Sequence, residues 1–169
     1  MELFETFDRD GNPRGLVPRD EVHARGLWHK STHVFVYDPQ DRLLIQRRSQ
    51  NKDLYPGLWD YSVGEHLLPG ESFLAGAHRG LAEELSIRVR DLEPLGEPRW
   101  SEVVAPNAVD REIQQAYRTV YVGDEIEIDP VEVAECTWAS RTELAGRLDE
   151  RPHTLTPWFA RDLRAFDLL

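Results

Sequence analysis

The sequence predicts a mixed α/β domain, of either the α+β or the layered α/β/α class, with one core that includes the whole chain. First, its 169 residues are close to the usual size of a single domain. Second, 40% hydrophobic and 30% charged residues are ordinary for a globular protein. Third, extended patterns come first along the chain and helical patterns are scattered later. We therefore expect one domain over residues 1–169.

In the first part of the chain, short apolar runs bounded by turn residues predict strands. Leu3–Phe7, closed by Asp10-Gly11, is the first of them. Pro18–Ala24 then predicts a short helix that Gly26 ends. The turn Asp38–Asp41 joins two apolar runs into a hairpin, and a polar loop leads to a further short strand. The strands of the hairpin and the strand after the loop are expected at His33–Tyr37, Arg42–Arg47 and Tyr61–Val63.

The later part of the chain opens with the helix that carries the most informative pattern, from about Ser72 to Ser86. Extended segments follow it, interrupted by an acidic connector at Asp124–Asp129 that we interpret as a solvated loop. Two helical patterns finish the chain, around Thr142–Leu148 and Pro157–Leu168. The extended segments are expected at Ile87–Val89, Trp100–Val104, Ile113–Val122 and Val131–Trp138.

Composition and charge exclude several classes of partner. The formal net charge of −11 argues against nucleic acid or an anionic membrane surface as the main partner. A phosphate substrate remains compatible, because a metal ion and a few local cations can override the overall field. No run approaches the ~20 apolar residues of a membrane span, and the first residues, MELFETFDRDGN, lack the pattern of a signal peptide. With a single cysteine, Cys136, we expect a cytoplasmic enzyme or binding protein.

The helix at 72–86 separates apolar from acidic residues. At 100° per residue, an apolar stripe that must pack on the sheet contains Leu74, Ala77, Leu81 and Leu85. Glu83 and Glu84 are expected on the far side, next to Arg79. Adjacent carboxylates that face anything but water need a cation, and hard oxygen ligands select Mg²⁺ or Mn²⁺. On these residues alone, an amphipathic helix with a solvated acidic face is the alternative.

The segment 64–87 resembles the Nudix box. The box has the form Gly, five residues, Glu, seven residues, Arg-Glu, an aliphatic residue, any residue, Glu-Glu, any residue, Gly and an aliphatic residue. Residues in register are Glu71, Arg79, Leu81, Glu83, Glu84 and Ile87. The resemblance implies the Nudix α/β/α sandwich with a mixed central sheet. It also implies that Glu83 and Glu84 are metal ligands, that Arg79 orients the acidic cluster, and that the backbone carbonyl of Gly64 joins the metal.

Three positions depart from the box: Glu65 and Ser86 replace its two glycines, and Gly80 replaces the Glu after Arg79. In many members of the family that Glu is a metal ligand or the base that activates water. Gly76 and Gly80 lie one turn apart on the face of Glu83 and Glu84, although each glycine inside a helix costs about 1 kcal/mol relative to alanine. They predict either a groove that a substrate group or neighbouring backbone approaches closely, or tolerated drift.

A closer resemblance is to the isopentenyl diphosphate isomerase branch of the family, in the stretches HxxxxxH, LLIQRRSQNK, YPGLWDYSVGEH and TPWF. In those isomerases a Cys performs the proton chemistry, and Gly64 stands at its position.

The resemblance also implies that Arg48 and Lys52 bind the diphosphate. Because side chains alternate along a strand, only one of Arg47 and Arg48 can face the site, and we expect Arg48. A second metal site, suited to Mn²⁺, Zn²⁺ or Fe, would consist of His23, His29, His66, Asp110 and Glu112; the alternative is ordinary polar histidines.

These patterns predict a metal-dependent Nudix hydrolase that cleaves the diphosphate of a nucleoside diphosphate derivative or a similar organic diphosphate. Mg²⁺ or Mn²⁺ is the expected cofactor, and Glu71 and Glu112 are expected to supply further carboxylates for the metal or water. Two alternatives remain open. One is a Nudix-fold protein that binds a diphosphate without turnover, because of Gly80. The other is an isomerase that acts without the Cys.

Overall fold

The central strand of the fold is β3 (Trp28–Tyr37), in a computed structural model that describes residues 2–105, 108–123 and 125–169. Along its whole length β3 pairs in parallel with β9 (Ala108–Val120). On its other side it pairs antiparallel with β6 (Val63–His66), from Ser31 opposite His66 to Val34 opposite Val63. One sheet therefore contains both parallel and antiparallel pairs, and the predicted mixed sheet is confirmed.

The hairpin predicted around the turn 38–41 forms only next to the turn. There β3 and β4 (Leu43–Arg48) pair through Tyr37 and Leu43, and then the two strands separate. β4 continues against β10 (Val133–Ala139) and the short β5 (Trp59–Asp60). The reason is competition for the edge of β3, because β6 takes the backbone groups that a longer hairpin would have used.

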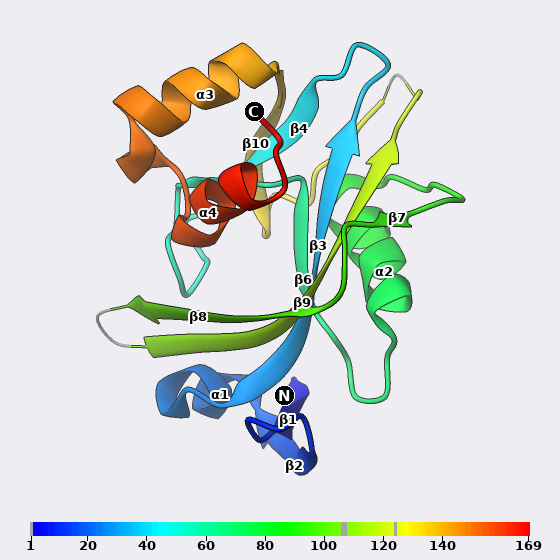
Figure 1. The fold of residues 1–169 in the computed structure, drawn as a ribbon. Coiled ribbons are helices and arrows are strands. Elements are labelled where there is room, and N and C mark those ends of the chain that lie inside the picture. The colour runs from blue at the N-terminus through cyan, green and yellow to red at the C-terminus, as the bar shows by residue number, and fades with distance from the viewer. Residues whose placement is uncertain (1, 106–107, 124) are drawn as a thin grey trace.

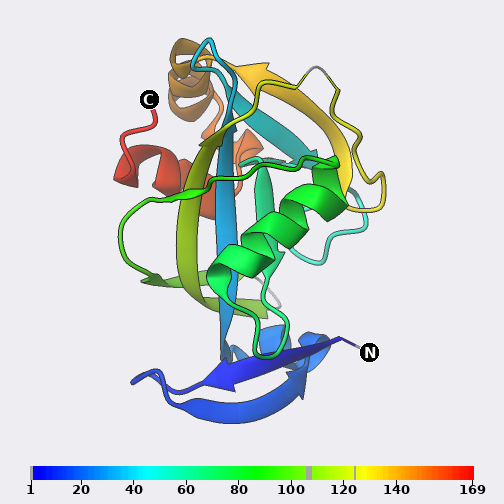
Figure 2. The same ribbon diagram turned by 90° about the vertical axis from the view of Figure 1, so that its right-hand side faces the viewer.

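Helices cover both faces of the sheet, which confirms the predicted α/β/α layers. Figures 1 and 2 show α2 (Phe73–Leu85) on one face, and Figure 1 shows α3 (Arg141–Glu150) and α4 (Pro157–Ala165) on the other. Because side chains alternate along a strand, Val34 and Val36 pack towards α2, whereas Phe35 and Tyr37 pack towards α3 and α4. All four side chains are buried, so β3 supplies both halves of the core.

The N-terminal residues form a small unit at one end of the sheet. β1 (Leu3–Phe7) has the predicted bounds and pairs with β2 (Pro13–Pro18), a mostly exposed strand that the sequence did not predict. α1 (Arg19–Arg25) follows and ends at Gly26, as predicted, with Gly26 in the left-handed region at φ 59°. A Cβ at Gly26 would lie 3.0 Å from Val109 Cβ, so glycine also lets the chain approach β9 closely.

The remaining elements are short or shifted relative to the predictions. β7 (Glu93–Pro94) and β8 (Arg99–Ala105) pair with β9, and η1 (Pro152–Thr154) connects α3 to α4. The strand predicted at 87–89 is wrong, because those residues have no strand partner. Of the acidic connector, residues 125–129 form no helix or strand, and Asp124 lies outside the described residues. Among the described residues, no helix has both the length and the apolar character that crossing a membrane requires.

Candidate active site

Helix α2 is fixed on the sheet by its buried face. Ser72 begins the helix by accepting a hydrogen bond from the backbone N–H of Ala75 at 3.2 Å. Ala77, Leu81 and Leu85 are fully buried against the sheet, as predicted. Leu74 was predicted on the same stripe but is 45% exposed. The reason is that the neighbouring Phe73 packs on the α2 side of the core in the first turn and leaves Leu74 towards water.

Arg79 organises the acidic residues around α2. Its guanidinium donates to both oxygens of Glu71, at 3.0 and 2.8 Å, and to the backbone carbonyl of His66 at 2.8 Å. It also contacts Glu83 at 3.2 Å and Glu65 at 3.3 Å. The hydrogen bonds from Arg79 lower the pKa of Glu71, although burial opposes them. Both oxygens of Glu71 are therefore engaged in holding Arg79, and one of them also accepts from the N–H of Leu68.

The two adjacent glutamates have different environments, so the prediction that both lie on the side of α2 away from the sheet is wrong for Glu84. The side chain of Glu83 is 60% exposed, whereas Glu84 is 3% exposed as a residue. Consecutive residues are 100° apart on a helix, and this rotation turns Glu84 to the sheet, where Gln46 on β4 donates to it at 2.9 Å. Burial raises the pKa of Glu84 to about 8, although Lys52 and Gln46 oppose the shift. Such a carboxylate holds a proton near neutral pH unless a cation replaces it.

Gly64 lies on β6 opposite His33, and it lines a cavity that is described below. A Cβ at this position would lie 2.7 Å from Cε2 of Tyr61 and 3.1 Å from its hydroxyl oxygen. The aromatic ring thus fills the space next to Gly64 that a larger side chain would need. Burial raises the pKa of Tyr61 well above its usual value, which keeps the phenol neutral.

The two glycines of α2 mark a close approach of neighbouring segments and not an open groove. A Cβ at Gly80 would lie 2.7 Å from Val63 Cγ1, and one at Gly76 would lie 3.2 Å from Leu67 Cδ1. Of the alternatives that the sequence left open, the close approach of neighbouring segments of this chain to the two glycines therefore applies. Both glycines are buried.

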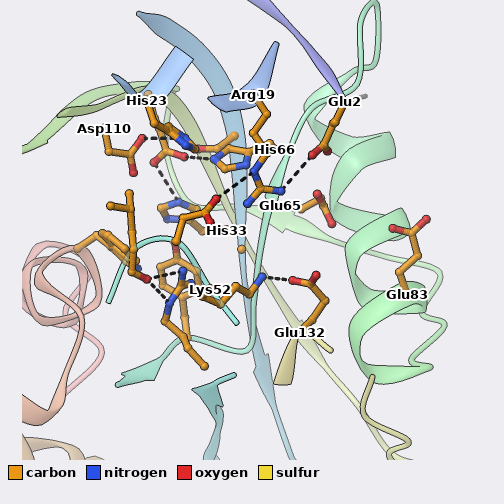
Figure 3. A pocket seen from close by; sticks show the side chains of 18 of the residues that line it. Glu2, Arg19, His23, His33, Lys52, Glu65, His66, Glu83, Asp110 and Glu132 are labelled. Atoms are coloured by element: carbon orange, nitrogen blue, oxygen red, sulfur yellow. Dashed lines mark hydrogen bonds and ion pairs between the residues drawn. The ribbon is translucent and has the colours of Figure 1, made fainter. Parts of the chain in front are cut away.

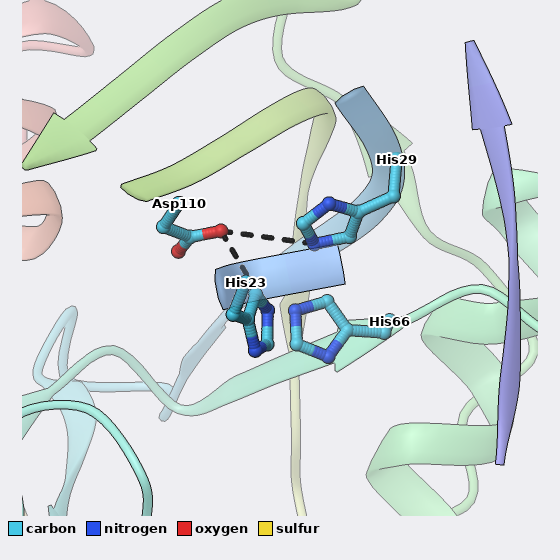
Figure 4. Close-up of side chains that lie close together, drawn as sticks. All are labelled: His23, His29, His66 and Asp110. Atoms are coloured by element: carbon cyan, nitrogen blue, oxygen red, sulfur yellow. Dashed lines mark ion pairs between the residues drawn. The ribbon is translucent and has the colours of Figure 1, made fainter. Parts of the chain in front are cut away.

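Four elements bring three histidines and two acids together. α1 carries His23, β3 carries His29, β6 carries His66, and β9 carries Asp110 and Glu112. In the sheet, His29 pairs with Glu112 across the parallel β3–β9 ladder, and His66 pairs with Ser31 across β3–β6. Figure 4 shows His23, His29, His66 and Asp110 pointing towards one another. Residues that lie far apart in the sequence thus form one cluster. We call His23, His29, His66, Asp110 and Glu112 together the histidine cluster.

The donor atoms of the histidine cluster fit a metal ion. His23, His29, His66 and Asp110 each offer one atom within 4.8 Å of the others. His29 Nε2 lies 3.7 Å from Asp110 Oδ1, and His66 Nε2 lies 3.3 Å from Glu112 Oε1. Three of these buried atoms have no hydrogen-bond partner: His23 Nε2, His29 Nε2 and Asp110 Oδ1. Buried polar atoms without partners are costly, and a cation at their centre would satisfy them together.

The protonation of the rings suits metal binding. Burial lowers the pKa of His23 to about 4 and that of His66 to about 3, and it also lowers the pKa of His29. All three rings are therefore neutral at neutral pH, the form that binds metal. His29 Nδ1 donates to the carbonyl of Leu27 at 3.0 Å, so its Nε2 lone pair faces the cluster. Burial and the nearby Glu112 raise the pKa of Asp110, as expected for two acids without a cation.

A cavity of about 310 Å³ connects the histidine cluster with the acidic face of α2. Its lining includes His23, His66 and Glu112 from the first, and Glu65 and Glu83 from the second. In Figure 3, His23 and His66 lie towards the top of the picture, Glu65 and Glu83 lie on the side of α2, and Lys52 lies below His66 and Glu65. Residues of the two sites that the sequence predicted separately therefore line one cavity.

The two predicted phosphate-binding cations also line this cavity. Arg48 donates to the carbonyl of Leu54 at 3.1 and 2.9 Å and to Asp60 at 3.2 Å, and its side chain is only 16% exposed. Lys52 forms an ion pair with Glu132. Arg47, which strand alternation directs outwards, pairs instead with Glu135. The cavity thus has one rigidly held cation and one on a loop.

The sequence analysis missed His33, which also lines the cavity. Its Nδ1 donates to the fully buried Asp162 of α4 at 3.3 Å, and its ring stacks on Tyr61 with 4.2 Å between centroids. Its Nε2 lies 3.9 Å from Glu112 Oε2. Asp162 also contacts Arg99 and Arg161. The alternation of HVFVY puts His33 on the face of Phe35, the one pattern in the sequence that points to a buried histidine.

Comparison with known proteins agrees with this fold. The family model of the NUDIX domain matches residues 27–159. The isopentenyl-diphosphate Delta-isomerase of Pectobacterium atrosepticum is 30% identical over 161 residues, which cover 94% of this chain and 89% of the relative. The isomerase of the same name from Streptomyces griseus is 32% identical over 167 residues, covering 96% and 82%.

Solved structures support the fold alone. DR0079 from Deinococcus radiodurans is similar with a TM-score of 0.74 at 19% identity, over 97% of this chain and 98% of that one. A MutT protein from Methanosarcina mazei Go1 is similar with a TM-score of 0.69 at 23% identity, over 83% and 93%. The class of protein is thus an α/β/α sandwich that carries the acids of the Nudix-like box on α2 and a cluster of histidines near them.

The chain belongs to the Nudix superfamily, within its isopentenyl diphosphate isomerase-like branch. Members of these families generally use divalent metals and act on small-molecule diphosphates, and the histidine cluster provides a set of possible ligands here. The activity of the chain is a Nudix-type activity related to diphosphates.

Proposed function

We propose that the protein is a metal-dependent hydrolase that cleaves the diphosphate of a nucleoside diphosphate derivative or a similar organic diphosphate. The observation that carries the proposal is the shared cavity. It joins Glu83 of α2, Glu65 of β6 and the histidine cluster to two cations, Arg48 and Lys52, within about 310 Å³. Cation-binding acids opposite positive side chains are the arrangement that a diphosphate needs, because the phosphate charges must be balanced on both sides.

Gly64 favours hydrolysis over isomerisation. The resemblance to the isopentenyl diphosphate isomerases puts Gly64 at the position of their proton-transferring Cys. Glycine cannot donate a proton, and the ring of Tyr61 lies where a thiol would start. A water molecule attacking phosphorus needs no side chain at this position.

The residues present fit divalent cations in two places. Glu83, Glu84 and the carbonyl of Gly64 offer hard oxygen ligands for Mg²⁺ or Mn²⁺. The histidine cluster, including Glu112, offers mixed nitrogen and oxygen ligands that suit Mn²⁺, Zn²⁺ or Fe. When bound, such cations neutralise phosphate oxygens and acidify water.

The side chains of the chain itself have distinct roles in this proposal. Arg79 holds Glu71 and Glu83 in place through its fork of hydrogen bonds. Arg48 and Lys52 bind the phosphate oxygens, and Lys52 exchanges its partner Glu132 for the substrate. Glu112 accepts a proton from the attacking water, because it lines the cavity and is ionised there. Although burial opposes the shift, the hydrogen bond from His66, 3.3 Å away, and the nearby histidines lower the pKa of Glu112.

A panel of organic diphosphates with Mg²⁺ and Mn²⁺, read by phosphate release, tests this function. We expect release from at least one nucleoside diphosphate derivative. Glu84→Gln should lower turnover at least about tenfold. Glu150→Gln, an exposed glutamate of α3, is the matched control and should leave turnover unchanged.

Three results would contradict the proposal. Activity that survives Glu84→Gln would refute the cation site on α2. Tight binding of a diphosphate without product would instead identify a binding protein. Isopentenyl diphosphate belongs in the same panel, because its conversion to dimethylallyl diphosphate would show that the chain is an isomerase despite Gly64.

A further inference from the structure

Two of the departures from the box touch each other. Glu65 stands where the box has its leading Gly, and Gly80 stands where it has Glu. β6 carries Glu65 along α2, so that a Cβ at Gly80 would lie 3.0 Å from Cβ and 3.4 Å from Cγ of Glu65. The side chain of Glu65 therefore occupies the space that a side chain at position 80 would fill.

Packing makes the two departures mutually dependent. A contact of 3.0 Å is tighter than carbon atoms adopt without displacement, and Val63 Cγ1 on the same strand lies 2.7 Å from the Cβ position. A glutamate at position 80 and one at position 65 would overfill the interface between α2 and β6. Moving the side chain from the helix to the strand keeps the volume of the interface nearly unchanged.

The carboxylate of Glu65 reaches the acidic face that a glutamate at position 80 would have served. Its Oε2 lies 3.3 Å from Arg79 Nη1, and the same nitrogen lies 3.2 Å from Glu83 Oε2. The Glu65 side chain is 17% exposed and borders the cavity together with Glu83. Figure 3 shows Glu65 and Glu83 on the α2 side of this cavity. The number of carboxylates at this face is thus preserved by the exchange.

This face has more negative charge than its own cations balance. One guanidinium, that of Arg79, contacts three carboxylates: Glu65, Glu71 and Glu83. Glu84 is buried, and its hydrogen-bond partner is the neutral amide of Gln46. Lys52 is paired with Glu132. A divalent cation bound by Glu65, Glu83 and Glu84 would balance this charge.

We propose that Glu65 replaces the carboxylate that is missing at Gly80, and that it binds the divalent cation of α2 together with Glu83 and Glu84. This inference rests on the cation site of the proposed function. Its test therefore measures cation binding in place of turnover, and it includes a variant that tests that site separately.

Titration calorimetry with Mg²⁺ is the test, because oxygen ligands hold Mg²⁺ whereas imidazoles prefer transition metals. Glu65→Gln keeps the shape of the side chain and removes its charge, so it should weaken Mg²⁺ binding about tenfold or more. Glu97→Gln, an exposed glutamate far from the cavity lining, should bind Mg²⁺ as the unaltered protein does.

The exchange itself can be reversed. Glu65→Gly alone should lose Mg²⁺ affinity. Adding Gly80→Glu together with Val63→Ala, which removes the Cγ1 atom 2.7 Å from the new Cβ, should restore most of that affinity. Gly80→Glu alone should lower the melting temperature without strengthening binding, since its space is occupied by Glu65 and Val63. Failure of the folded triple variant to recover affinity would overturn the inference.

Unchanged Mg²⁺ affinity in Glu65→Gln would also overturn it, and Glu84→Gln shows which idea has failed. If Glu84→Gln weakens binding and Glu65→Gln does not, the cation site stands and Glu65 is not a ligand. If neither variant changes the affinity, the cation site on α2 is itself wrong.

Discussion

At the scale of single residues, Glu84 shows how burial changes a carboxylate. It lies on the box helix beside Glu83, yet it is 3% exposed and faces β4. Burial raises its pKa to about 8 from a usual value of 4.5. The cation-free protein therefore favours the protonated form, and a bound cation must displace this proton.

Glu84→Gln is expected to change the pH dependence of stability. Because the pKa of Glu84 is raised in the folded state, its contribution is fully present below about pH 4.5 and is lost as the pH rises through about 8. In EDTA at pH 8.5, Glu84→Gln should therefore be more stable than the unaltered protein, by at most a few kcal/mol. Urea unfolding at a series of pH values measures this.

The difference between the two proteins should shrink as the pH falls below 4.5, where Glu84 becomes protonated in both the folded and the unfolded state. Adding Mg²⁺ should reverse the order at pH 8.5, because only the carboxylate can bind it. A variant that is less stable than the unaltered protein in EDTA at every pH would contradict the burial argument. Glu97→Gln, on the surface, should show no such dependence.

Gly64 allows a second prediction about a single residue. Gly64→Cys should lower the free energy of unfolding by about 1–3 kcal/mol, because the new Cβ would lie 2.7 Å from the ring of Tyr61. The loss caused by Gly64→Cys should be smaller in a Tyr61→Ala background, where the ring is absent. Urea unfolding of the four proteins measures this coupling. Equal losses in both backgrounds would show that Tyr61 is not the obstacle.

At the scale of elements, helix α2 is held by a narrower face than its sequence suggests. Leu74 and Leu81 are seven residues apart on the same predicted stripe, but Leu81 is fully buried and Leu74 is 45% exposed. Phe73 packs on the core in the first turn in place of Leu74. The first turn of α2 is therefore packed through Phe73, and Leu74 contributes little to the core.

A matched pair of substitutions tests this. Leu81→Ala should cost about 2–5 kcal/mol of stability, since it leaves a cavity between helix and sheet. Leu74→Ala removes the same atoms from a half-exposed position and should change stability by within about 0.5 kcal/mol. Both values come from urea unfolding. Similar costs for the two variants would mean that the first turn of α2 is packed more tightly than the structure shows.

At the scale of the whole molecule, the histidine cluster connects the N-terminal unit to the rest of the sheet. α1 supplies His23, whereas β3, β6 and β9 supply the other ligands. Next to the histidine cluster, the ring of Phe4 on β1 stacks on His29 and packs against His66. A cation held there would therefore join α1 to the sheet through His23.

Metal binding at the cluster should accordingly stabilise the protein. At about 100 times the dissociation constant, Zn²⁺ or Mn²⁺ should raise the melting temperature by roughly 5–10 °C and slow amide hydrogen exchange in α1. His66→Ala should abolish both effects, whereas His153→Ala, at an exposed histidine, should keep them. Equal stabilisation of the two variants would locate the metal elsewhere.

Local patterns predicted a large part of the fold. The bounds of β1, the cap of α2 at Ser72 and the end of α1 at Gly26 follow from turn and capping chemistry within a few residues. β2 was missed because PRGLVP is mostly exposed and has no apolar alternation. The predicted hairpin was wrong beyond its turn, because pairing with β6 depends on a segment that comes much later in the chain.

The sequence by itself determined the family, the layered fold and the residue types that can bind cations, because the spacing of the box and the period of each element are local properties. Only the tertiary structure decided which acids are buried, and that Glu65 lies in the space beside Gly80. It also decided that histidines from three separate elements converge beside Asp110. Burial and convergence depend on how distant elements pack, and no short stretch of sequence contains that information.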